Sequence, residues 1–406
     1  MLRSLFSGIS GLRAHQQMMD VTGNNIANVN TTGYKSSQTV FQDTLSQMVN
    51  AAGAPQNQAG GTNPAQVGLG VRTASINANF SQGAAQTTGK SGDMMIQGDG
   101  FFITKSGGES VYTRAGSFTF DANGSLTTPN GQIVQGWSAD TQGVVNTAGA
   151  PDDIKLPIGI SLQPVATTKF TLTGNLSFEA AVGPTSAKTI PIPTIDANGQ
   201  SGTLEVVLTK MTNDPSGVAR WQMTMPNVTP AVPAQTIYFP GGRASTSLVP
   251  APGSDQTTMN GYAIDFKDVT HYAGNTEARV SASDGSAAGI LSSYTVSNTG
   301  QIVGVFSNGL KQTLGQLALA NFNNVNGLEK IGDSMFRSTV NSGLAQVGSA
   351  GSAGLGLITS GALEMSNVDL AQEFTNLVIA QRGFQANSRI ITTSDEILQE
   401  LVNLKR

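Results

Sequence analysis

The sequence predicts a mainly β protein with an α-helix at each end of the chain, arranged as nested domains around a coiled-coil-like helical core. Near both termini, apolar residues recur at alternating spacings of four and three, the heptad period of packed helices. Between the termini, short alternating runs end at Gly or Asn-Gly, which is typical of hairpins. Small residues at 147–151 and 281–289 indicate a domain inserted into a loop of another domain.

Composition excludes several functional classes. The chain has 406 residues, two His and no Cys, so we expect no metal site, no disulfide and no thiol catalysis. Its net charge of −4 argues against nucleic acid as a partner. Charged residues are only 12% of the chain, yet no apolar run approaches the ~20 residues of a spanning helix, so we expect no membrane insertion.

The termini predict helices over about 4–28 and 366–404. The N-terminal seam contains Leu5, Ile9, Leu12, Gln16, Met19, Gly23 and Ile26. The C-terminal seam contains Leu370, Phe374, Leu377, Gln381, Phe384, Ser388, Ile391, Asp395, Leu398 and Val402. Ser366 and Asp369 form an S-x-x-D pair that is typical of a helix start, with Ser366 as the first capping residue.

Neither helix can bury its apolar stripe alone, which leaves two interpretations. The two termini pair within one molecule, or they pack against other copies, and we favour the second. The residues expected at these helix contacts between subunits are Leu5, Ile9, Leu12, Met19, Ile26, Leu370, Phe374, Leu377, Phe384, Ile391 and Leu398.

The β region divides at the small-residue stretches. We expect a discontinuous helical core (1–43 and 361–406), an extended polar linker (44–67), an inner β domain (68–147 and 285–360) and an inserted outer β domain (148–284). Asn123-Gly124, Asn130-Gly131 and Asn308-Gly309 are hairpin turn signals. Much of the linker is low-complexity and polar, so alone it should be mobile.

Catalytic motifs are not found. Gly89-Lys90-Ser91 resembles the end of a phosphate loop, but the required first Gly is Ala84. His15 and His271 have no companions at metal-ligand spacing. We therefore expect no catalytic residue, no cofactor and no enzyme activity. A glycan-binding module at 151–284 is the alternative, with Trp221 and Tyr238 lining a sugar site; we favour core or interface roles for both.

Four ordered motifs carry a resemblance to a known family. Residues 24–35 (NNIANVNTTGYK) resemble the N-terminal signature of bacterial flagellar rod, hook and hook-associated proteins, and 361–369 with 379–387 resemble the second signature. Residues 98–102 and 112–118 resemble the β domain that these axial proteins share. The motif positions taken as site residues are Asn28, Thr31, Gly33, Tyr34, Lys35, Leu363, Glu364, Ser366, Asn367, Val368 and Asp369.

The resemblance implies a structural subunit of the flagellum. The inserted domain of 148–284 is similar to that of hook subunits, which form a curved, flexible tube that transmits torque from rod to filament. The resemblance further implies self-association into a helical homopolymer, and contacts with the distal rod, the hook cap and the hook–filament junction proteins. It also implies export through the flagellar type III apparatus to the outside without a cleaved signal peptide. A distal-rod subunit is the alternative, because the polar stretch at 44–66 is similar to an extension of rod proteins.

Overall fold

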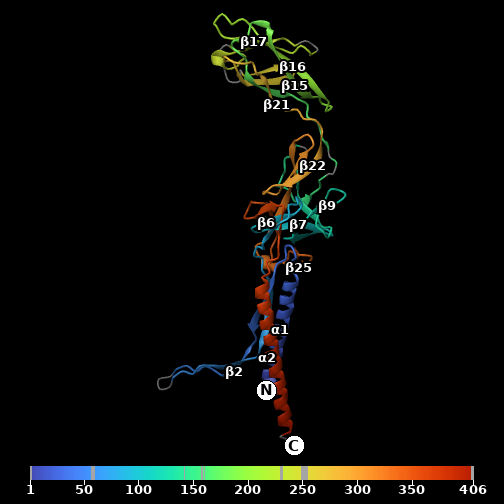
Figure 1. The fold of residues 1–406 in the computed structure, drawn as a ribbon. Coiled ribbons are helices and arrows are strands. Elements are labelled where there is room, and N and C mark those ends of the chain that lie inside the picture. The colour runs from blue at the N-terminus through green and yellow to red at the C-terminus, as the bar shows by residue number, and fades with distance from the viewer. Residues whose placement is uncertain are drawn as a thin grey trace. The chain divides into compact units, whose positions relative to one another are not determined.

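A computed structural model describes residues 2–55, 60–140, 142–156, 159, 161–228, 232–247 and 255–403. The chain forms two compact units. Unit 1 comprises Met1–Ile158, Tyr294–Gly304 and Gln312–Arg406, and unit 2 comprises Gly159–Ser293 and Val305–Lys311. The fold is mainly β with one helix toward each end of the chain, which confirms the predicted class (Figure 1).

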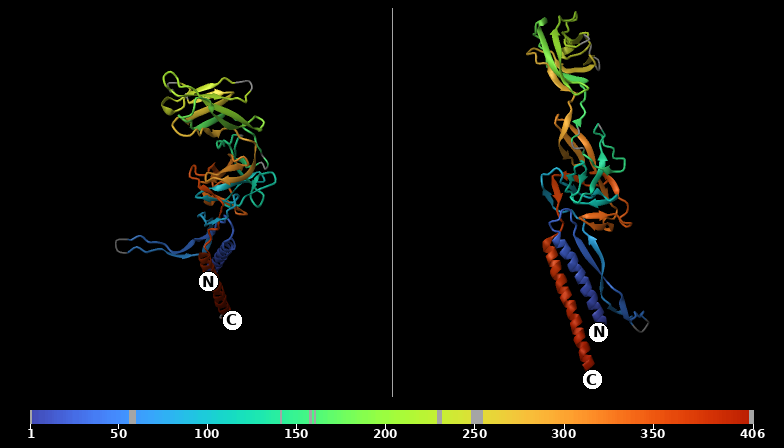
Figure 2. Two further views of the ribbon diagram at one scale, coloured as in Figure 1. Left: turned by 45° about the horizontal axis from the view of Figure 1, so that its top comes forward. Right: turned by 90° about the vertical axis from the view of Figure 1, so that its right-hand side faces the viewer.

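Two long helices and a set of short strands make up unit 1. Helices α1 (Leu2–Ala27) and α2 (Leu370–Asn403) lie side by side (Figures 1 and 2). The strands assigned mainly to this unit are β1 (Ser37–Asp43), β2 (Ser46–Asn50), β3 (Ala65–Gly68), β4 (Val71–Ala78), β5 (Ala85–Thr87), β6 (Met94–Gln97), β7 (Phe101–Ser106), β8 (Glu109–Thr113), β9 (Thr119–Phe120), β10 (Leu126–Thr127), β11 (Ile133–Ser138), β12 (Asp152–Asp153), β24 (Lys311–Asn321), β25 (Glu329–Gly332), β26 (Met335–Arg337), β27 (Gln346–Ser349), β28 (Leu357–Ser360) and β29 (Ala362–Glu364), with a 3-10 turn η2 (Val325–Gly327).

The core of unit 1 is a sheet with the strand order β24-β11-β7-β8-β26-β25. Phe101 and Phe102 are neighbours on β7 and are both buried, but they pack in separate apolar clusters. This follows from the strand period, because successive side chains point to opposite faces of a sheet. Both faces of this sheet are therefore covered.

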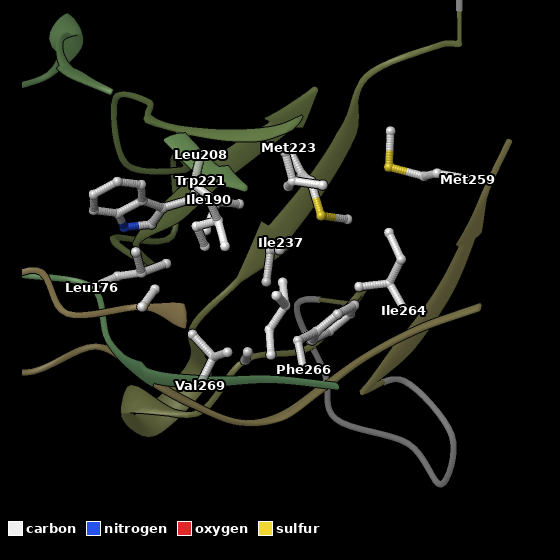
Figure 3. Packing of buried hydrophobic residues seen from close by; sticks show 14 of the residues in the cluster. Leu176, Ile190, Leu208, Trp221, Met223, Ile237, Met259, Ile264, Phe266 and Val269 are labelled. Carbon is white, nitrogen blue, oxygen red and sulfur yellow. The ribbon is translucent and has the colours of Figure 1, made fainter. Parts of the chain in front are cut away.

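Unit 2 contains two four-stranded sheets, β15-β16-β17-β18 and β19-β20-β14-β21. Its elements are β13 (Ser161–Leu162), β14 (Lys169–Asn175), β15 (Gly183–Ile195), β16 (Ser201–Lys210), β17 (Arg220–Thr224), β18 (Gln235–Tyr238), η1 (Pro240–Gly242), β19 (Gln256–Met259), β20 (Tyr262–Thr270) and β21 (Arg279–Ser283). Strands β22 (Gly289–Val296) and β23 (Gln301–Phe306) carry residues of both units. Figure 3 shows side chains of unit 2 pointing into one shared core around Trp221 and Phe266.

Strand β15 is an edge strand with a distinctive pattern. Ile190 and Ile192 point into the core and are 2% and 0% exposed. Pro191 and Pro193 alternate with them and pair opposite Glu205 and Thr203 of β16. Proline has no backbone N–H, so it is tolerated in a sheet only where that position faces away from a partner strand.

The structure differs from expectation at two places outside the cores. Strands β2 and β3 pair within the stretch expected as an extended linker (44–67), because antiparallel pairing satisfies backbone N–H and C=O groups even where side chains are polar. Residues 56–59 of that stretch lie outside the described residues. Residues 148–156, expected in the inserted domain, belong to unit 1, since Asp152 and Asp153 pair with β11.

No helix of the described residues is long and apolar enough to cross a membrane. No group of three or more His, Cys, Asp or Glu side chains within the described ranges is placed to hold a metal ion.

Candidate self-assembly site

A seam of small residues brings α1 and α2 together. A methyl group added at Gly11 would lie 2.8 Å from the Asn387 side chain, and one added at Gly8 would lie 3.5 Å from the Asn387 carbonyl. A methyl group at Gly383 would lie 2.5 Å from the His15 ring. Because glycine has no side chain, the two helix backbones approach closely. Residue numbers rise along one helix as they fall along the other, so the helices are antiparallel.

The predicted stripe on α1 is displaced from this seam. Gly8, Gly11, Thr22 and Asn25 are buried, and each immediately precedes a predicted seam position. One residue corresponds to about 100° around a helix. Leu5, Leu12, Met19 and Ile26 are consequently half-buried, and Ile9 is 39% exposed. The two helices do pair within one molecule, but through small residues, and the large apolar residues border the contact.

On α2, some residues of the predicted stripe lie along the contact with α1, and others are exposed. Leu377, Phe384, Ile391 and Leu398 are half-buried along the seam. Leu370 and Phe374 are 40% and 53% exposed, whereas Ala380 and Ser394, one residue before predicted positions, are buried.

The two helices also expose six further large apolar side chains, of which only Val402 belongs to a predicted stripe. These are Phe6, Val378, Ile379, Ile390, Ile397 and Val402, each between 42% and 68% exposed. Single exposed apolar residues are ordinary, but a concentration of them marks an interaction surface. The apolar surface of α1 and α2 is thus only partly used within one molecule.

Three sequence motifs of unit 1 meet at one buried ionic cluster, which we define as Lys35, Glu364 and Arg114. Lys35 Nζ lies 2.7 Å from Glu364 Oε1, and Arg114 Nη1 lies 3.5 Å from Glu364 Oε2. The side chains of Lys35 and Glu364 are fully buried, and that of Arg114 is 4% exposed. One carboxylate therefore joins the N-terminal motif, the C-terminal motif and the β-domain motif.

The charges of this ionic cluster depend on one another. Burial lowers the pKa of Lys35 from its usual value, and the hydrogen bond and negative charge of Glu364 oppose that shift. Burial also lowers the pKa of Arg114, and the charges of Glu364 and Asp99 oppose it. The carboxylate of Glu364 is therefore what makes two buried cations tolerable at this position.

Backbone hydrogen bonds tie the two terminal motifs together around the ionic cluster. The Gly33 N–H donates to the Glu364 carbonyl at 2.7 Å. The Ser36 N–H donates to Asn367 Oδ1 at 2.8 Å, and Asn367 Nδ2 donates to the Asn79 carbonyl at 2.8 Å. The motif residues Gly33, Glu364 and Asn367 therefore hold the chain that leaves α1 against the chain that enters α2.

Tyr34 extends this network to both helices. Its hydroxyl donates to Asn25 Oδ1 at 3.1 Å, and Asn25 Nδ2 donates to Glu373 Oε1 at 3.0 Å. Lys330 Nζ lies 4.8 Å from the centre of the Tyr34 ring and donates to the Lys35 carbonyl at 2.8 Å. Burial, with a smaller contribution from the Glu373 charge, raises the pKa of Tyr34.

The start of α2 differs from the prediction. The helix begins at Leu370, and Asp369 Oδ1 accepts hydrogen bonds from the N–H groups of Ala371 at 2.9 Å and Gln372 at 3.2 Å. Asp369 is thus the N-cap, and Ser366, whose Oγ accepts from the Val368 N–H, is not. The pairing of β29 with β5 keeps the preceding residues extended, which delays the helix start.

The remaining motif residues shape the chain near the helix ends. Thr31 Oγ1 donates to Asn28 Oδ1 at 3.0 Å, and Asn28 Nδ2 donates to the Asn24 carbonyl at 2.9 Å, just beyond α1. Leu363 and Val368 are half-buried. These contacts stabilise the backbone where the chain leaves α1.

Substitution at Gly33 tests how tightly the motif is packed. Gly33 has φ +66°, and an added methyl group would lie 2.4 Å from the Ala115 backbone nitrogen. We expect Gly33→Ala to lower the free energy of unfolding of unit 1 by about 2–4 kcal/mol, measured by thermal unfolding. Gly23→Ala is the control: no atom lies within 4 Å of its added methyl group, so this helical substitution should stabilise by about 0.5–1 kcal/mol. Equal stability of the two variants would contradict this account.

The structure does not support the alternative glycan site. Trp221 is 0% exposed and lies in the core of unit 2, so its ring is not available for stacking on a sugar. Tyr238 is half-buried.

Several residues of the network were missed as site residues, among them Asn25, Arg114, Lys330 and Glu373. Asn25 and Arg114 stand inside the quoted motifs, but nothing in their spacing showed that they would be buried. Lys330 lies outside every motif, and no sequence signal pointed to it.

Three family models match this chain. Residues 5–35 match the family described as flagella basal body rod protein, and residues 95–178 match the flagellar hook protein FlgE/F/G D1 domain. Residues 359–404 match the flagellar basal body rod FlgEFG protein C-terminal family. The first and last matches include most of α1 and α2.

Similar proteins align along the whole chain. The flagellar hook protein FlgE of Borreliella burgdorferi is 40% identical and that of Treponema pallidum 37% identical, each over 100% of both chains. The flagellar basal-body rod protein FlgG of Bacillus subtilis is less similar, at 33% identity over 100% of both chains. A crystal structure of the Helicobacter pylori flagellar hook protein FlgE2 shares the fold, with a TM-score of 0.50 over 69% of this chain and 100% of that chain, at 14% identity. The full-length identities show that the chain belongs to the flagellar hook protein family, FlgE.

Proposed function

We propose that the chain is the structural subunit of the flagellar hook and polymerises with copies of itself into a curved, flexible tube that transmits torque. The observation that carries this proposal is the apolar surface left on α1 and α2 after they have paired. Phe6, Phe374 and Ile397 are 65%, 53% and 51% exposed, and water would be excluded from them in a polymer.

Each part of the chain has a place in this proposal. The discontinuous terminal domain (1–43 and 361–406) forms the inner helical core of the tube. The inner β domain, which includes 148–156 in addition to 68–147 and 285–360, and the remainder of the inserted domain form layers outside it. The apolar residues proposed above for helix contacts between subunits, from Leu5 to Leu398, border the seam and remain partly accessible to a neighbouring copy.

The ionic cluster supports a role in carrying load. A joint that transmits torque must not let its helices rotate independently of the β domain that follows them. Glu364 is hydrogen-bonded or ion-paired to Lys35, Gly83 and Arg114, which come from separate segments of unit 1. Buried, mutually dependent charges fix one arrangement rather than several.

The proposal includes export and partners. The chain leaves the cell through the flagellar type III apparatus without a cleaved signal peptide. It contacts the distal rod at one end of the tube, and the cap during growth or the hook–filament junction proteins at the other. It performs no catalysis and needs no cofactor.

Immunogold electron microscopy tests the proposal against a distal-rod role. Antibody against residues 151–284 is applied to isolated flagella with basal bodies attached. We expect label along the short curved segment between rod and filament. Label confined to the straight shaft inside the envelope would make the chain a rod subunit.

The β2–β3 hairpin gives a prediction about stiffness. Leu45, Met48 and Val49 are 84%, 56% and 56% exposed, and a two-stranded ribbon is marginally stable alone. We expect deletion of residues 46–68 to leave tubes that assemble but bend at least twofold more easily, measured from their curvature fluctuations by electron microscopy. Replacement of the three apolar residues by Ser keeps the length and should have the same effect. Unchanged stiffness in both would leave the hairpin as a passive spacer.

A further inference from the structure

His271 is buried in unit 2, although its side chain can take up a charge near neutral pH. It directly follows β20 and is 6% exposed. The rings of Phe239, Phe178 and Trp221 lie 5.1, 5.7 and 6.2 Å from the His271 ring, centre to centre. None of these three side chains carries a charge. An imidazolium at this place would therefore exchange water for apolar surroundings.

The two ring nitrogens of His271 have different surroundings. Nδ1 lies 2.8 Å from the carbonyl oxygen of Leu176, and because a carbonyl only accepts, Nδ1 carries the proton. Nε2 is buried and has no hydrogen-bond partner among the described residues. The neutral ring therefore suits the site, whereas a second proton, on Nε2, would find no acceptor there.

A second buried base lies near His271. Lys210, the last residue of β16, is 8% exposed, and its Nζ donates to the carbonyls of Phe178 and, at 3.0 Å, Ala180. Among the described residues, Lys210 is the charged group that acts on His271. Burial lowers the pKa of His271, the hydrogen bond to Leu176 opposes this shift, and the charge of Lys210 adds to it.

Both bases are hydrogen-bonded to one short segment, residues 176–182, which we call the clasp. Three alternate carbonyls of the clasp accept from the two side chains. The N–H groups of Leu176 and Phe178 donate to the carbonyls of Thr270 and Tyr272 at 2.9 and 3.0 Å. Phe178 packs on the His271 ring and is itself 57% exposed, so the clasp separates this ring from solvent. Opening the clasp would let water reach the imidazole without dismantling the sheets of unit 2.

We propose that protonation of His271 opens the clasp, which makes unit 2 sensitive to acid between about pH 7 and 5. The open state exposes the imidazole and binds a proton more readily than the closed state. The closed state therefore loses stability as the pH falls below 6.5, the ordinary pKa of histidine, by at most tenfold per pH unit. The inference concerns a single chain and does not depend on the proposed self-assembly.

Hydrogen exchange of the dispersed full-length chain tests the proposal. Exchange is followed by mass spectrometry at pH 7.5 and 5.0 and corrected for the intrinsic rates. We expect the protection of amides 176–182 to fall by about 5- to 30-fold, the upper figure being that of a histidine that stays neutral in the closed state. Protection of β7 in unit 1 should change by less than about twofold, because carboxylates protonate mainly near pH 4. Unchanged protection of the clasp, or an equal loss in β7, would overturn the inference.

His271→Asn removes the titrating group, and its side-chain amide can still donate to the Leu176 carbonyl. We expect the clasp of this variant to be equally protected at pH 7.5 and 5.0. His15→Asn is the control: it removes the other histidine of the chain, which lies on α1 in unit 1, and should keep the pH dependence of the wild type. An acid-dependent loss of protection that persists in His271→Asn would contradict the assignment to His271.

A titration of the wild-type chain gives a result that does not depend on the folding of any variant at 271. The chain has two histidines, so NMR of histidine labelled with ¹³C at Cε1 gives two signals, and His15→Asn identifies that of His271. We expect the His271 signal to titrate with a midpoint below pH 6.5. A midpoint at or above pH 6.5 would show that the closed state tolerates the imidazolium and would overturn the inference.

Discussion

Glu364→Gln is expected to lower the free energy of unfolding of unit 1 by about 3–5 kcal/mol, because it leaves Lys35 and Arg114 buried without a full counter-charge. Glutamine has nearly the same shape as glutamate, so the loss of stability would report the missing charge and not a change in side-chain volume. Thermal unfolding followed by far-UV circular dichroism measures it, since the two long helices of the described chain both belong to unit 1.

Glu329→Gln is the matched control, because it removes an ion pair that is exposed and not buried. Glu329 lies 4.0 Å from Arg337, and their side chains are 57% and 48% exposed. Water screens such a pair, so Glu329→Gln should change the stability by no more than about 1 kcal/mol. If Glu364→Gln behaved like Glu329→Gln, the ionic cluster would not be what holds the three motifs together.

Phe374→Asp is expected to weaken assembly strongly while the monomer remains folded. The side chain is 53% exposed in one molecule, so the monomer should lose little stability. In the tube, the variant would lose about 2–3 kcal/mol of apolar burial and would bring a charge into the contact, which together raise the critical concentration by at least ~100-fold. Sedimentation of polymer against total concentration measures this.

Gln385→Asp serves as the comparison for that experiment. It introduces the same charge at an exposed polar position of the same helix. We expect its critical concentration to stay within about threefold of the wild type, because no apolar contact is removed. Normal assembly of Phe374→Asp would show that the exposed face of α2 does not contact a neighbouring subunit.

The sequence predicted the helices well because their signal is local. Heptad spacing identified both terminal helices, and the α2 start was missed by only a few residues, since two capping residues compete three positions apart. The contact between α1 and α2 within one molecule lies beside the predicted stripe of α1, whereas contacts of the stripes with other subunits stay a prediction. Gly8, Gly11 and Gly383 make this contact, as the absence of a side chain at these positions allows, whereas Gly23 does not take part in it.

Long-range contacts explain what could not be predicted. Lys35 and Glu364 are separated by 329 positions, and their meeting depends on how β29 pairs with β5 and how the chain leaves α1. The motifs marked the neighbourhood of this contact. Only the fold showed that their charged residues converge on a single carboxylate.

Pro191 and Pro193 have a consequence for contacts between copies of the chain. A regular lattice repeats every surface of its subunit at high local density, so an unprotected strand edge would meet other copies of itself constantly. Two prolines at alternate positions of β15 remove two N–H donors that an added strand would require. The addition of a further strand along this edge of the sheet is thereby disfavoured.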